Sequence, residues 1–242
     1  MNSNRKNARW AGVFYIIATV APILTFPFTG FLGGGVAGEP SADYLVDLGA
    51  NENQVIVGML IELVWVLAVV GIIVTLFPIL RIFNEALARV FSALRFIEAI
   101  STVVSSIILL TLLTLSLEFA EAGFPDASYY QTAGTLLLAA RDWAFIIGSG
   151  LIWSLSALIL NYVLYQSKLI PRWLSGWGLV GATLSFAAYL AQSFGANPTE
   201  LLFLPIAVQE MVFAVWLIFK GFNSSAIASL NAKPNTSAHG GF

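Results

Sequence analysis

The amino-acid sequence predicts an all-α polytopic membrane protein, a bundle of six transmembrane helices with both termini in the cytoplasm. The first observation is composition. Of the 242 residues, 58% are hydrophobic and only 10% are charged, whereas a soluble domain carries about 25% charged residues. The second is the length of the apolar runs, because about 18 apolar residues suffice for a helix to cross a bilayer. Six such runs lie near residues 10–30, 54–80, 87–117, 134–165, 173–193 and 201–222.

Lysine and arginine residues predict the orientation of the spans. They precede the first span, lie in the connections after the second and fourth, and end or follow the sixth: Arg5, Lys6, Arg9, Arg81, Arg89, Lys168, Arg172, Lys220 and Lys233. The other three connections hold acidic residues and no lysine or arginine. Because Lys and Arg accumulate in cytoplasmic loops, we expect both termini on the cytoplasmic side.

The first span begins like a secretory signal, with basic residues before an apolar run. That run continues to about Leu32, longer than a signal core, and no convincing cleavage site follows, so we interpret it as an uncleaved span. The Gly-rich segment TGFLGGGVAGEP (29–40) lacks the Lys-Ser/Thr ending of a phosphate-binding loop and is expected to be a flexible external loop. Residues 1–223 should form the six-helix domain and residues 224–242 a disordered cytoplasmic tail.

The last two spans carry local signals. The fifth has small residues four positions apart, which favours close packing on a neighbouring helix: Gly178, Gly181, Ala182 and Ser185. Before the sixth, Asn197, Pro198 and Glu200 predict an N-cap, a first helical residue and a capping-box partner. Pro205 is expected inside that helix, where it would free a backbone carbonyl.

The candidate functional residues are ionisable groups inside the predicted spans: Glu62, Arg95, Glu98, Arg141, Asp142 and Glu210. A charge at the bilayer centre costs about 2.5–3.5 kcal/mol. The deeper an ionisable side chain lies in the membrane, the more its presence requires an explanation. Glu210 stands ten residues from both Glu200 and Lys220, close to the midplane. The two arginines, each with its neighbouring acid, can alternatively lie at the membrane boundaries, because the rest of each run nearly spans the bilayer.

Together these residues predict a site for a ligand or a proton. The second, fourth and sixth spans run in the same direction, so Glu62, Asp142 and Glu210 can face one pocket, with an arginine as counter-charge. The third span has a polar stripe at helical spacing that should face the bundle interior: Ser92, Arg95, Glu98, Thr102 and Ser105. Four acids against two arginines leave an excess of negative charge, and burial disfavours a charged carboxylate. Some acids should therefore be protonated or hold a cation, or else serve only to join helices.

Several function classes lack the residues they need. The chain has no cysteine, and its one histidine, His239, lies three residues from the end. No Ser-His-Asp set, HExxH motif or histidine-based zinc site can be assembled, so we expect no catalytic set, no metal site and no cofactor. The net charge of −2 and the absence of a basic domain argue against nucleic acid as a partner.

Four stretches resemble a bacterial integral-membrane family, domain-of-unknown-function family 4386: ARWAGVFYII (8–17), LRFIEAI (94–100), KLIPRWLSGWGLVGA (168–182) and LPIAVQEMVFAVWLIFKGF (204–222). The resemblance covers nearly the whole chain apart from two long external loops and the tail. It implies a six-helix, multi-pass protein of the bacterial cytoplasmic (inner) membrane, in which Arg95, Glu98 and Glu210 match typical polar positions. It implies no activity.

Three functions stay open. The first is a small proton- or cation-linked transporter or ligand-binding membrane protein with an outer-facing acidic pocket. The second is a non-catalytic membrane component that partners another protein or senses the envelope. The third is a lipid-modifying enzyme with paired carboxylates as acid and base, for which the sequence offers no nucleophile or metal motif. The partners expected are the lipid bilayer and a proton, cation or small ligand.

Overall fold

The computed structural model describes residues 3–29, 43–123 and 128–232, and within these ranges the regular structure is helical, with no strand. Among the described residues, six helices are long and apolar enough to cross a membrane. They are Ser3–Thr29, Glu52–Phe83, Glu85–Glu121, Tyr129–Ser167, Arg172–Ser193 and Glu200–Phe219. The predicted all-α bundle of six spans is therefore confirmed.

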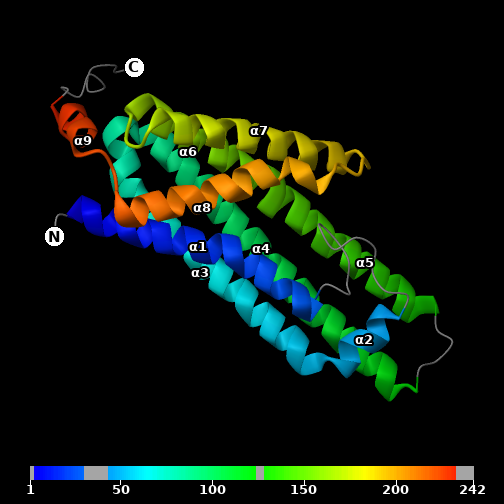
Figure 1. Ribbon diagram of the computed structural model, residues 1–242. Coiled ribbons are helices and arrows are strands. Elements are labelled where there is room, and N and C mark those ends of the chain that lie inside the picture. Colours follow the sequence, from blue (N-terminus) through cyan, green and yellow to red (C-terminus); the bar gives the residue numbers. More distant parts are fainter. Residues whose placement is uncertain (1–2, 30–42, 124–127, 233–242) are drawn as a thin grey trace, which may run out of the picture.

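The elements follow in the order α1 (Ser3–Thr29), α2 (Tyr44–Ala50), α3 (Glu52–Phe83), α4 (Glu85–Glu121), α5 (Ser128–Ala144), the π-helix η2 (Phe145–Ile152), α6 (Trp153–Ser167), α7 (Arg172–Ser193), the 3-10 turn η3 (Glu200–Leu202), α8 (Leu204–Phe219) and α9 (Ser224–Asn231). Helix α1 packs against α3 and α8, while α7 packs against α6 and α8 (Figure 1). The ends of α3, α4 and α5 project with α2 beyond α7 and α8 (Figure 1). Helix α4, with 37 residues, is about 55 Å long, well beyond the roughly 30 Å of a bilayer core.

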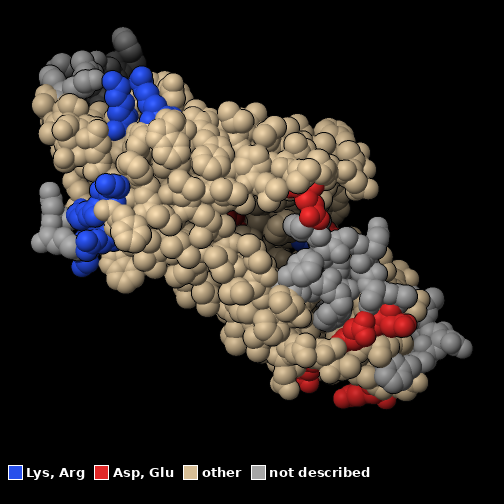
Figure 2. Space-filling model, viewed as in Figure 1, with Lys and Arg blue, Asp and Glu red and all other residues tan. Residues whose placement is uncertain are grey.

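Charge is separated along the bundle. In Figure 2, lysine and arginine gather at the end that holds the start of α1 and the end of α8, and acidic residues lie toward the opposite end. We call these the basic end and the acidic end. The separation in space follows from the distribution of charges along the sequence, since the connections after α3 and α6 also lie at the basic end (Figure 1).

The polar stripe predicted for the third span faces the interior, as expected. On α4 the stripe residues Arg95, Glu98, Thr102 and Ser105 are buried, and Ser92 is half-buried. One cluster of buried apolar side chains, which includes Ile72, Phe91 and Phe213, lies on the basic-end side of the stripe, and another, which includes Leu48 and Leu112, lies on the acidic-end side. The polar groups are thus held between two apolar layers.

The fourth span is not the continuous α-helix that its apolar run predicts, because α5 and α6 are joined by the π-helix η2. A Cβ atom at Gly148 would clash with the side chain of Ser101, so this stretch approaches α4 closely. The hydroxyls of Ser149 and Thr102 lie 3.3 Å apart across the same contact. π-Helical segments are rare and occur frequently at functional sites.

The start of the sixth span differs from its prediction. Thr199, not Asn197, is the N-cap, and it caps the short turn η3. Helix α8 begins only at Leu204, so Pro205 lies in its first turn. The N–H groups of the first turn have no hydrogen-bond partner within the helix, so a proline there breaks no hydrogen bond. The prediction that Pro205 lies inside the helix and frees a backbone carbonyl is therefore wrong.

Residues 224–231, predicted to be disordered, instead form α9. The side chain of Asn223 caps this helix by accepting hydrogen bonds from the N–H groups of Ser225 and Ala226. Ala226 and Ile227 are buried in the basic-end core, which explains the order. The rest of the tail from residue 233, and the Gly-rich segment 29–40 apart from Thr29, lie outside the described residues.

The small residues of α7 allow two close contacts, as predicted. Gly178 faces the side chain of Asn161 on α6, and Gly181 faces the backbone of Ile206 on α8. A Cβ at Gly181 would lie 2.8 Å from the backbone nitrogen of Ile206. Since a backbone atom cannot rotate away, any side chain at this position must push the two helices apart.

We therefore expect Gly181→Ala to lower the free energy of unfolding in detergent by about 1–3 kcal/mol, as overpacking typically does. Gly176→Ala is the matched control on the same helix, because its Cβ would meet only a ring atom of Tyr165 at 3.8 Å. The control should be neutral or stabilising by up to about 1 kcal/mol. Equal effects of the two substitutions would contradict the packing argument.

Candidate functional site

A buried arginine joins three helices near the middle of the bundle. Arg95 of α4 donates from Nη1 to Oε2 of Glu98, 3.0 Å away and one turn along the helix. Its Nη2 donates to the hydroxyl of Tyr15 on α1 at 3.1 Å and lies 3.8 Å from Oε1 of Glu210 on α8. We call these four residues, together with Thr19, the Arg95 cluster.

Glu210 is held from a second side. Its Oε2 accepts a hydrogen bond from Thr19 of α1 at 3.1 Å, and the side chain of Trp153 on α6 is a further hydrogen-bond partner. Arg95 and Glu98 are each 1% exposed, and Glu210 is 9% exposed. Arg95 and Glu98 therefore lie at the same level along the bundle as Glu210.

The Arg95 cluster contains one more acid than base. One guanidinium faces two carboxylates, so the group carries a charge of −1 when all three are ionised. Within the described chain, Nε of Arg95 has no hydrogen-bond partner although it is buried. A buried charge that is not balanced costs several kcal/mol. The arrangement is therefore suited to taking up a proton or a cation.

A cavity of about 200 Å³ lies against the cluster and is lined by Tyr15, Thr19, Arg95, Glu98 and Glu210. Aromatic side chains from several helices supply much of the remaining wall: Trp65, Phe145, Trp153, Tyr189 and Phe203. Because Phe203 immediately precedes α8, the cavity extends from the cluster toward the acidic end. The molecule is hollowed between α8 and α1 in Figure 2, and charged side chains are visible inside the hollow.

A second polar cluster joins α3, α4 and α5. Glu62 forms an ion pair with Arg141 and accepts a hydrogen bond from Ser106 at 2.6 Å. Nη1 of Arg141 also donates to the backbone carbonyl of Ser105 at 3.1 Å. One acid and one base balance each other here, and their side chains are 7% and 16% exposed.

Of the three acids predicted to share a pocket, only Glu210 lines the cavity beside the Arg95 cluster. Of the described residues, those that line the cavity include Glu210 but not Glu62 or Asp142. Glu62 belongs to the second cluster, and Asp142 is partly buried on α5 beside Arg141 in sequence. The place predicted for them is taken by Glu98. Of the two arginines considered as counter-charges, Arg95 serves Glu210 and Arg141 serves Glu62.

Sequence reasoning missed several residues of the site. Tyr15 and Thr19 lie four positions apart and so share one face of α1, a pattern that could have marked them in an otherwise apolar span. Trp153 and Ser149 carry no comparable signal. Gln209, next to Glu210, was also missed. It donates to Oδ1 of Asn161 at 3.4 Å and to the carbonyl of Leu174 at 3.2 Å.

The Glu62–Arg141 pair yields a stability prediction. Arg141→Gln should lower the free energy of unfolding by about 3–5 kcal/mol, because it leaves a buried carboxylate without its counter-charge. Adding Glu62→Gln should restore most of the loss. Arg89→Gln is the control: the Arg89–Glu85 pair is 70% and 59% exposed, and exposed pairs contribute about 0–1 kcal/mol. Chemical unfolding in detergent gives the free energy of unfolding of the wild type, the two single variants and the double variant. A double variant as unstable as Arg141→Gln would contradict the explanation.

Comparison with known proteins identifies the family. No curated protein and no solved structure matches the chain. A family described as a domain of unknown function, DUF4386, matches residues 10–221. That range contains all the ionisable site residues, together with Tyr15, Thr19 and Trp153. The chain is a multi-pass membrane protein that belongs to the DUF4386 family.

Proposed function

We propose that the protein is a small transporter or ligand-binding protein that takes up a proton or a small cation in the cavity beside Glu210. Glu210 and Glu98 are the acidic groups of this site, and Arg95 is their shared counter-charge. The observation that carries the proposal is the unbalanced charge of the Arg95 cluster at the wall of a cavity. Glu62, Arg141 and Asp142 have a supporting role beside the site.

The chemistry of the wall supports a cation as the ligand. A cation near Glu210 would balance the excess carboxylate, and aromatic faces attract cations through their ring quadrupoles. Trp65, Trp153 and Tyr189 offer such rings. A proton on one carboxylate would balance the cluster in the same way. Among the described residues there is no group of three or more His, Cys, Asp or Glu side chains that would hold a metal ion.

The distribution of charge supports an outward-facing site in a bacterial inner membrane. If the basic end is cytoplasmic, as the positive-inside rule predicts, both termini are inside and the acidic end is outside. The cavity extends from the Arg95 cluster toward the acidic end. A ligand would then enter from outside.

The buried amide contacts favour a second candidate function, a non-catalytic membrane component. Gln209 and Asn161 link α8 to α6, and Gln209 also reaches α7. Hydrogen bonds between transmembrane helices contribute about 0.6 kcal/mol each, so these groups act as structural contacts. On this alternative the Arg95 cluster would do the same, and uptake of a proton or cation would be absent.

Intrinsic fluorescence tests the proposal directly, because Trp65 and Trp153 line the cavity. We expect the emission and the melting temperature of the purified protein to change on titration over roughly pH 5 to 9, or on addition of sodium, potassium or tetramethylammonium. Glu210→Gln should remove the response and preserve the fold, since an amide keeps the size of the side chain. Glu200→Gln is the control, because Glu200 is exposed at the acidic end.

Two outcomes would overturn the proposal. A wild-type protein that responds neither to pH nor to any of the three cations has no such site. A folded Glu210→Gln variant that responds like the wild type would show that the response comes from a group other than Glu210. If Glu210→Gln fails to fold, Glu98→Gln provides the same test, since Glu98 shares the guanidinium of Arg95.

A further inference from the structure

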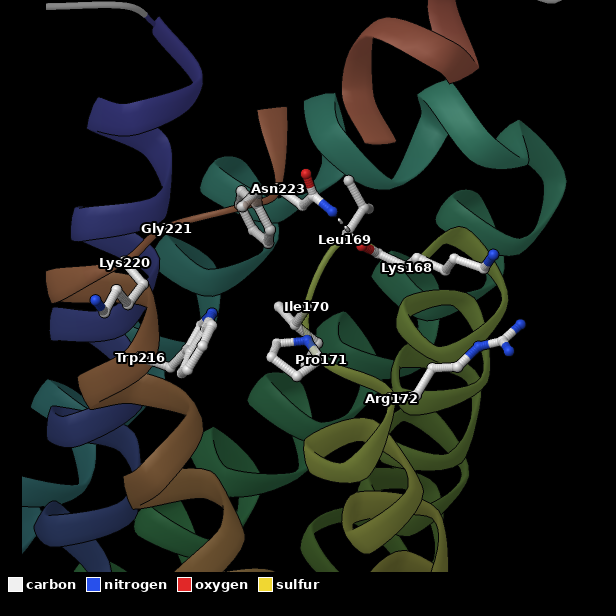
Figure 3. A pocket seen from close by; sticks show the side chains of 10 residues that line it. Lys168, Leu169, Ile170, Pro171, Arg172, Trp216, Lys220, Gly221 and Asn223 are labelled. Carbon is white, nitrogen blue, oxygen red and sulfur yellow. Dashed lines mark hydrogen bonds between the residues drawn. The ribbon is translucent and has the colours of Figure 1, made fainter. Parts of the chain in front are cut away.

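A second pocket, of about 460 Å³, lies at the basic end between the α6–α7 connection and the segment that follows α8. Figure 3 shows Lys168 and Arg172 extending to one side of it and Lys220 to the other, with Trp216 and Pro171 between them. The pocket therefore has an apolar floor and cations around its rim. No acidic residue is among the described residues that line it.

The three cations are available to a ligand. Lys168, Arg172 and Lys220 are exposed, and none of them forms an ion pair with another described residue. The guanidinium carbon of Arg172 lies over the ring of Tyr165, 5.1 Å from its centre, a contact that leaves the charge of the group in place. Arg5 differs from these three, because it donates to the carbonyls of Ile218 and Phe219 at the end of α8.

Lys168 stands in an unfavourable backbone conformation. It ends α6 with φ 56° and ψ 25°, in the left-handed region, and it is the only non-glycine residue with positive φ among those described. Helices that end in this way usually place glycine there, because glycine has no Cβ to clash. A lysine at this position costs stability, which is consistent with a use for its charged side chain.

The start of α7 adds backbone donors near the pocket. Helix α7 starts at Arg172, and its N-cap residue Pro171 makes no side-chain capping hydrogen bond. The first N–H groups of an α-helix have no partners within the helix, and the N-terminus of a helix favours anions. Pro171 and Arg172, at the start of this 22-residue helix, line a pocket with three cations and no acid. The N–H of Leu174 already donates to the carbonyl of Pro171, so the N–H groups of Arg172 and Trp173 are the donors that remain.

We propose that this pocket binds an anionic phosphate group, with the phosphate of a lipid headgroup as its source. The charged ends of Lys168, Arg172 and Lys220 point away from the pocket in Figure 3 and would turn inward to contact the phosphate oxygens. The apolar floor of Trp216, Ile170 and Pro171 would contact the adjoining glycerol and acyl carbons. A lipid is favoured over a soluble phosphate compound because a floor of this kind suits hydrocarbon and because basic pockets between helices recognise anionic headgroups. The site is separate from the Arg95 cluster, since no residue lines both pockets.

Binding is tested on the full-length protein in a non-ionic detergent. Short-chain phosphatidylglycerol, short-chain phosphatidylcholine and inorganic phosphate are added separately, and the melting temperature and apparent affinity are measured for each. We expect phosphatidylglycerol to raise the melting temperature and phosphatidylcholine to have little effect. Inorganic phosphate that binds as tightly as the anionic lipid would support the phosphate site but make a soluble compound its source.

Lys168→Gly provides a variant that removes the cation without harming the fold. Glycine adopts the left-handed conformation freely, so the melting temperature without lipid should be unchanged or higher. Affinity for phosphatidylglycerol should fall about fivefold, the effect of about 1 kcal/mol for one charge near the surface, and further in combination with Lys220→Gln. Lys6→Gln is the control, because it removes the same charge at the same end from an exposed residue outside the pocket.

Three results would overturn the proposal. No stabilisation by either the anionic lipid or phosphate would show that the pocket binds neither. Equal binding of Lys168→Gly and wild type would show that the rim cation does not contact the ligand. An equal loss in Lys6→Gln would show that only the general charge of the basic end matters.

Discussion

The burial of one guanidinium constrains how this bundle closes. Arg95 is 1% exposed, and an ion placed in a medium of low polarity costs several kcal/mol unless partners surround it. One partner, Glu98, lies on its own helix α4. The others lie on α1 and α8, which are at opposite ends of the sequence. The rings of Tyr15 and Phe91 also flank it, with centres 5.5 and 5.9 Å away. The first and last spans must therefore meet beside α4.

The sequence predicts the spans and the buried face of α4, but not which residues meet across the helix interfaces. Hydropathy and helix length predict the six spans because the bilayer permits few alternatives for an apolar segment of that length. The stripe on α4 predicts its buried face, since side chains three and four positions apart point the same way. Neither pattern identifies the partner across the interface. Glu62 was expected beside Glu210, yet it pairs with Arg141, because the rotation of α3 is set by packing that no local pattern records.

Details of the backbone were predictable to a smaller extent. The π-helix η2 depends on contacts with Ser101 on α4 and Tyr189 on α7, which meet Gly148 and Gly150. Those contacts join residues far apart in sequence, so the apolar run over 134–165 predicts only an ordinary helix. The late start of α8 and the order of α9 also depend on contacts between residues far apart in sequence. Helix α9 forms because Ala226 and Ile227 find a place in the core, whereas its composition resembles a flexible tail.

The two polar clusters differ in a way that bears on function. Glu62 and Arg141 form a balanced pair that joins α3 to α5, with Ser106 satisfying the second carboxylate oxygen. A structural contact requires no more than this. The Arg95 cluster adds a second carboxylate to one guanidinium, leaves Nε of Arg95 without a described partner, and lies beside a cavity.

An unbalanced site costs stability relative to a balanced one, and Glu210 could have been an uncharged residue if joining helices were its sole role. This excess of acid is the reason that we propose binding, and not helix packing alone, as the role of the cluster. The same comparison applies to Lys168 at the basic end, where a lysine stands in a conformation that glycine adopts more easily. Glu210 and Lys168 each line a pocket, and the two proposals assign to each pocket a ligand of opposite charge.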